Sequence, residues 1–206
     1  MGLLFYTDEY EPEVCKQMNK PLKKLYIWLL VVFIMASYCV TAVVVARHRF
    51  SDYNISYNYT TEQYVQVKSD FAQELLTLEY EEMTRGQILA QAKKEVPVKF
   101  YLFFNVRPPK AGAAGGTFLV PRIIVVDPSL DDTHYIMATV HELLHLKNFT
   151  MSETYTQFQT FVTLYESEDP LFHRAALILA LEIFRGAYPK DYTCTGNIVN
   201  YITERS

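Results

Sequence analysis

One short run in this chain has residue types that suit metal chemistry, His141-Glu142-Leu143-Leu144-His145. Residues four apart lie on one face of a helix, so both imidazoles can reach a single cation. Zn²⁺ binds neutral imidazole readily, and a catalytic zinc site uses three protein ligands and one open position. Glu142 lies beside this cation, where its carboxylate can take a proton from water and pass it to a leaving amine. The run therefore predicts one zinc ion with Glu142 as the general base.

A third ligand is needed, and Glu153 is the leading candidate, eight residues after His145. Asn148 can end the helix that carries the histidines, and Ser152 can cap the next one. Glu153 would then lie in the first turn of a helix that returns past the metal.

Four other residues remain open as members of this site. Glu166, 21 residues after His145, is the alternative third ligand. His173 is a weaker rival for the same position. Gln157 and His134 are candidates for outer contacts that orient the ligands, because they fall one or two turns from predicted ligands on their helices.

The secondary structure around these residues follows from hydrophobic periodicity and from chain breakers. A helix is expected over 131–146, with an apolar face that includes Met137, Val140 and Leu144. Two β-prone runs are expected as strands, 98–106 and 117–126, and Pro121 makes the second an edge strand or a bulged one. The Pro-, Gly- and Ala-rich residues 108–116 are expected to form a flexible connection between them. Further helices are expected over these ranges: 62–78, 84–95, 152–166, 171–185 and 195–204. This order predicts an α+β fold.

Together these features resemble the small HExxH zincin metallopeptidases of the gluzincin type, in which a Glu is the third ligand. The similarity covers residues 96–166 and rests on Ile123-Ile124-Val125-Val126, the following Asp-Pro, the histidine helix and the helix after it. It implies a small zincin-like domain and an extended peptide substrate held along a strand edge. The site residues it implies are the zinc ligands His141, His145 and Glu153 and the general base Glu142.

A different function is predicted for residues 25–46, which contain no charged side chain. Twenty-two residues of helix span roughly 33 Å, close to the ~30 Å of a bilayer core. Four lysines precede this run and two arginines follow it closely, which favours an uncleaved signal anchor with a cytoplasmic N-terminus and a non-cytoplasmic catalytic domain. The predicted organisation is a tail (1–24), a transmembrane anchor (25–46), a stalk (47–61) and the metallopeptidase domain (62–206).

Composition narrows the class of partner. The 206 residues are half hydrophobic and carry a net charge of −4, so a nucleic-acid partner is not expected, because phosphate binding requires a basic surface. Three cysteines are too few for a disulfide scaffold. The expected partners are a protein or peptide substrate and, through residues 25–46, a membrane.

The sequence thus predicts a membrane-anchored zinc endopeptidase. The alternative is a non-catalytic, membrane-tethered module of zincin fold that binds a protein partner, and a third reading is a structural membrane protein with a chance HExxH run. Zinc content separates the third reading from the first two. Turnover by Glu142→Gln separates the first from the second.

Overall fold

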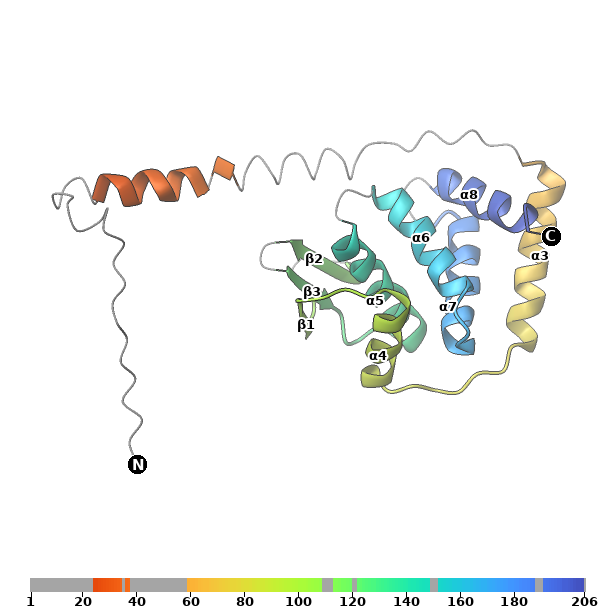
Figure 1. Ribbon diagram of the computed structural model, residues 1–206. Coiled ribbons are helices and arrows are strands. Elements are labelled where there is room, and N and C mark those ends of the chain that lie inside the picture. The colour runs from red at the N-terminus through yellow and green to blue at the C-terminus, as the bar shows by residue number, and fades with distance from the viewer. Residues whose placement is uncertain are drawn as a thin grey trace, which may run out of the picture. The chain divides into compact units, whose positions relative to one another are not determined.

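The computed structural model describes residues 24–34, 36–37, 59–108, 113–119, 122–148, 152–187 and 191–205. The chain divides into two compact units, Met1–Ala46 and Arg47–Ser206, and each is described separately below. Figure 1 shows the elements of both units along the chain.

The described part of the first unit is helical over 24–34 and 36–37. Its large apolar side chains, from Leu25 to Ile34, are exposed. Within the described residues, no helix has both the length and the apolar character that crossing a bilayer requires. The prediction of a single-pass membrane protein with a cytoplasmic N-terminus and a non-cytoplasmic domain is therefore wrong.

Parts of that predicted organisation lie outside the described residues. They are the tail residues 1–23, the last part of the predicted anchor, 38–46, and most of the predicted stalk, 47–58.

The second unit is mostly helical, with one small sheet. Its elements, in chain order, are α3 (Thr61–Thr77), α4 (Arg85–Glu95), β1 (Leu102–Asn105), β2 (Gly115–Leu119), β3 (Arg122–Val126), α5 (Asp132–Lys147), α6 (Glu153–Tyr165), α7 (Pro170–Phe184) and α8 (Asp191–Thr203). The predicted fold class, α+β with a transmembrane helix ahead of the domain, is therefore wrong. This unit is mostly helical and has one small three-stranded sheet. The strands contain only four or five residues each, much less than the predicted runs.

The second predicted strand, 117–126, forms two antiparallel strands instead of one. Thr117 pairs with Ile124 in the β2–β3 ladder, so the chain reverses between them. The sheet order is β1-β3-β2, with β1 parallel to β3. The edge position predicted for the whole run therefore holds for its first half, β2, whereas β3 is the central strand.

Alternation along these strands determines which face of the sheet meets the helices. Ile124 and Val126 of β3 are fully buried, as expected for side chains that point toward α5. Leu102, Phe104 and Phe118 have the opposite orientation and are exposed. In Figure 1 the sheet and α3 lie on opposite sides of this unit, with α5, α6 and α7 between them.

Helices α5 and α7 form the centre of the hydrophobic core. α5 contacts β2, β3, α4, α6 and α7, and ten of the fifteen residues of α7 are buried. Burial on most sides makes α5 a rigid support. Side chains that α5 directs toward its neighbours are therefore held in place by packing, as a preorganised site requires.

Candidate metal centre

Helix α5 carries the two histidines and has a defined start and end. The Asp131 side chain accepts a hydrogen bond from the His134 backbone N–H at the N-terminus, and Asn148 is the C-cap. Between these ends, His141 and His145 are one turn apart and both face α6. The His145 side chain is 2% exposed and that of His141 is 17% exposed, so His145 is enclosed and His141 is partly open to solvent.

Helix α6 brings the third group, Glu153. The connection from Lys147 to Glu153 is short, and such connections join antiparallel helical neighbours. Ser152 caps α6 by accepting from the Tyr155 backbone N–H, as predicted. Glu153 is consequently the first residue of α6, at the level of the histidines on α5.

The three side chains meet through one atom each. The Nε2 atoms of His141 and His145 are 3.0 Å apart, and the Glu153 Oε2 atom lies 3.2 Å from the first and 3.1 Å from the second. The imidazole rings are nearly perpendicular, with an interplanar angle of 82°. Among the described residues, these three form the group of His, Cys, Asp and Glu side chains that is close enough to hold a metal ion.

These separations fit a tetrahedral zinc site. Ligand atoms at the ~2.0–2.2 Å bond lengths of zinc, placed at tetrahedral angles, lie about 3.3–3.5 Å from one another. The observed triangle of 3.0–3.2 Å is slightly tighter, and a widening by a few tenths of an ångström gives the three atoms tetrahedral spacing. The donor set of two imidazoles and one carboxylate is also one that zinc accepts.

The charge of Glu153 suits the same role. Burial opposes its ionisation, but the contacts between its Oε2 atom and the imidazoles of His141 and His145 outweigh that effect and lower the pKa of Glu153 far below its usual value. The carboxylate is therefore ionised at neutral pH, as binding to a metal requires.

Two threonines of α6 contact the far side of the imidazole rings. Thr160 Oγ1 lies 3.3 Å from His141 Nδ1, and Thr156 Oγ1 lies 3.5 Å from His145 Nδ1. Both threonines are buried. Neither threonine was predicted from the sequence; the predicted outer contact was Gln157, which points about 100° around the helix from Thr156. The Thr-x-x-x-Thr spacing, which repeats the histidine spacing of α5, was the available signal.

Glu142 faces β2 rather than α6. Its carboxylate is mostly buried, and the Thr117 hydroxyl donates to Glu142 Oε2 at 2.5 Å. Gly115, two residues earlier on the same face of β2, makes the space: a Cβ atom there would lie 2.9 Å from Glu142 Cγ and 3.0 Å from Oε1. Strand β2 therefore both accommodates and orients the predicted general base.

Gly115 and Thr117 were not recognised from the sequence. Gly115 was assigned to the flexible connection 108–116, whereas the structure places it and Gly116 in β2. The signal was a glycine pair directly before a β-prone run, because glycine in a strand often marks a close approach of another group.

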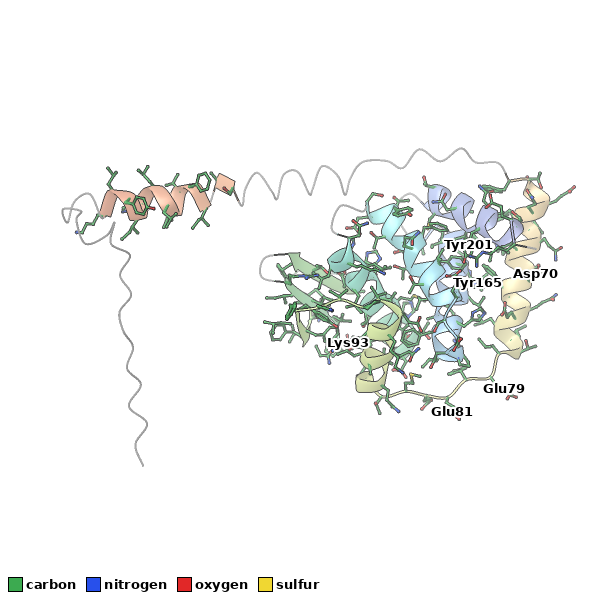
Figure 2. All side chains as sticks on the ribbon, in the orientation of Figure 1. Asp70, Glu79, Glu81, Lys93, Tyr165 and Tyr201 are labelled. Atoms are coloured by element: carbon green, nitrogen blue, oxygen red, sulfur yellow. The ribbon has the colours of Figure 1, made fainter. Side chains whose placement is uncertain are left out.

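The remaining candidates lie elsewhere. The Glu166 carboxylate accepts from Tyr201 at 2.5 Å and from Arg205 at 2.7 Å, and these two bonds lower its pKa. Tyr201, labelled in Figure 2, belongs to α8, so Glu166 joins the ends of α6 and α8. His134 bonds Asp131 at 2.6 Å and Glu182 at 2.9 Å through its two ring nitrogens.

His173, the third rival, is also bound away from the histidine pair. Its Nε2 atom lies 2.8 Å from Glu74 on α3, and its Nδ1 atom lies 2.8 Å from the Tyr165 carbonyl oxygen. These contacts tie α7 to α3 and to the end of α6. His173 therefore takes part in packing between helices.

Comparison with protein-family models, with curated proteins and with solved structures gave no match to this chain.

Proposed function

We propose that this protein is a zinc-dependent endopeptidase of the gluzincin type, with the ion held by His141, His145 and Glu153 and with Glu142 as general base. The observation that carries the proposal is the triangle of three ligand atoms, 3.0–3.2 Å apart. Two helices supply it, and the acid that follows the first histidine is held separately by β2. A pair of histidines that served only packing would need neither the carboxylate nor the oriented acid.

Zinc bound by this triad would supply Lewis-acid activation of a water molecule and of the scissile carbonyl. The chain supplies the proton transfers. Glu142 accepts a proton from the water as its oxygen attacks the carbonyl carbon, and it returns that proton to the amine nitrogen as the C–N bond breaks. Because Thr117 holds Oε2, we assign this transfer to Oε1.

Burial of Glu142 supports this role. Glu142 is 8% exposed, so few water molecules compete for its carboxylate. The hydrogen bond from Thr117 of β2 limits the side chain to one orientation. A general base works best when it is held in place before the substrate arrives.

The test uses the full chain loaded with one equivalent of zinc and a mixed peptide library, with products read by mass spectrometry with and without chelator. We expect chelator-sensitive cleavage by the wild type. Glu142→Gln should keep zinc and lose about 10²- to 10⁴-fold in turnover, the usual contribution of a general base.

Glu168→Gln is the matched control, because it removes one exposed carboxylate beyond the end of α6. It should cleave at the wild-type rate. Turnover by Glu142→Gln equal to wild type would remove the general-base assignment. A wild type that holds zinc and cleaves nothing would favour the binding module instead.

A further inference from the structure

The hydroxyl groups of Thr156 and Thr160 have only one direction available for their hydrogen bonds to the histidines. Thr160 Oγ1 donates to the Thr156 carbonyl oxygen at 2.8 Å, and Thr156 Oγ1 donates to the Ser152 carbonyl oxygen at 2.9 Å. A carbonyl oxygen can only accept, and a hydroxyl has a single proton. Each hydroxyl proton is therefore committed to its own helix.

The contact with the imidazole must then run the other way. Thr160 Oγ1 at 3.3 Å and Thr156 Oγ1 at 3.5 Å can only accept, so His141 and His145 donate their Nδ1–H groups. A neutral imidazole has one ring proton, so a proton at Nδ1 leaves Nε2 bare. These Nε2 atoms are the ones that converge with the Glu153 carboxylate.

We propose that Thr156 and Thr160 are positioning residues that select the Nδ1-protonated tautomer of both histidines and so present two bare Nε2 atoms to a zinc ion. This inference rests on the proposed zinc site. Outer hydrogen bonds to metal-binding histidines are often made by carboxylates or backbone carbonyls. Here two neutral hydroxyl groups accept these hydrogen bonds and add no negative charge around the cation.

Both threonines are on the helix that carries Glu153. Helix α6 thus supplies one ligand and the two groups that orient the others, while α5 supplies the imidazoles. The ligands and their supports therefore assemble together when these two helices dock.

The test measures zinc affinity of the full chain for Thr156→Val and Thr160→Val, by competition with a chelator of known affinity. Valine keeps the shape of threonine and removes the hydroxyl. Each change should weaken zinc binding about 10- to 100-fold, the usual effect of losing an outer contact. Thr156→Ser and Thr160→Ser keep the hydroxyl and should restore affinity to within about threefold, well inside that loss.

Thr154→Val is the matched control, because residue 154 points about 200° around α6 from Thr156. It should leave zinc affinity unchanged. Wild-type affinity in both valine variants, or equal losses in the serine variants, would overturn the proposal.

A second measurement decides the matter even if the valine variants fail to fold. In the zinc-free wild type, at a pH where both rings are neutral, histidine ¹⁵N NMR should show the ring proton of His141 and His145 on Nδ1. A proton on Nε2 of either ring would refute the assignment. Affinity and tautomer are both read without substrate, so a chain that binds zinc as expected but cleaves nothing would refute only the endopeptidase proposal.

Discussion

The close approach of Gly115 to Glu142 allows the general base to be displaced without touching a metal ligand. In Gly115→Ala, the new Cβ atom would lie 2.9 Å from Glu142 Cγ, 3.0 Å from Oε1 and 3.2 Å from the Val125 carbonyl oxygen. Ordinary contacts begin at 3.4 Å, so the worst overlap is 0.5 Å. The Val125 oxygen belongs to the ladder between β2 and β3 and cannot yield easily, so the Glu142 side chain must move.

The size of the effect follows from that overlap. A misplacement of about 1 Å in a catalytic group costs about 10²-fold in rate, so a shift of about 0.5 Å should cost about tenfold. Stability should fall by no more than about 2.5 kcal/mol, because overpacking costs about 1–3 kcal/mol and replacing a strand glycine by alanine recovers about 0.5–1 kcal/mol. Zinc affinity should be unchanged, because Gly115 faces Glu142 and not the ligand triangle.

Gly116→Ala is the control that the chain itself offers. It makes the same substitution in the same strand, but a Cβ at Gly116 would have no atom within 4 Å. The assay compares kcat, zinc affinity and Tm of both variants with those of the wild type, on one peptide identified from the library. The reasoning fails if Gly115→Ala keeps the wild-type kcat, or if Gly116→Ala loses as much.

Two further predictions concern the third zinc ligand and His134. Glu153→Ala should weaken zinc binding by more than the ~100-fold that loss of an outer contact costs. Glu166→Ala should leave zinc binding unchanged. The opposite result in a zinc titration would reassign the third ligand. Burial opposes protonation of His134, but hydrogen bonds to Glu182 and Asp131 raise its pKa above 6.5 overall. Its stabilising effect is therefore fully present below pH 6.5 and is lost as pH rises through the raised value. Because the His134 side chain is 39% exposed, this stabilisation should amount to no more than about 1 kcal/mol. We expect Tm to fall more steeply from pH 6 to 8 in the wild type than in His134→Gln.

Local geometry explains why sequence placed Glu153 correctly beside the histidines. A helix fixes the relation of His141 to His145 within one turn, and capping residues give the end of one helix and the start of the next. The short connection then makes α6 run antiparallel along α5. Each of these steps depends on neighbours in the chain, which is the information that a single sequence contains.

The failures depend on distant neighbours or on assembly of the whole unit. The approach of Gly115 to Glu142 joins residues 27 positions apart, and no local pattern reports it. The run 117–126 has continuous β propensity, and only pairing in the sheet shows that it reverses into two strands. Residues 25–46 were assigned to a membrane from their apolar length and flanking charges, whereas no helix among the described residues has the length and apolar character that a span needs.

The match between α5 and α6 also explains why the site depends on register. His141 and His145 are four residues apart on one helix, and so are Thr160 and Thr156 on an antiparallel neighbour, so the two hydrogen bonds form together at successive turns. A slip of one residue rotates α6 by about 100° and removes both contacts, and it also turns Glu153 away from the histidines. The apolar packing of α6 against α5 and α7 is therefore what keeps the ligand set intact. The core of this unit and its candidate chemistry are specified by the same helix interface.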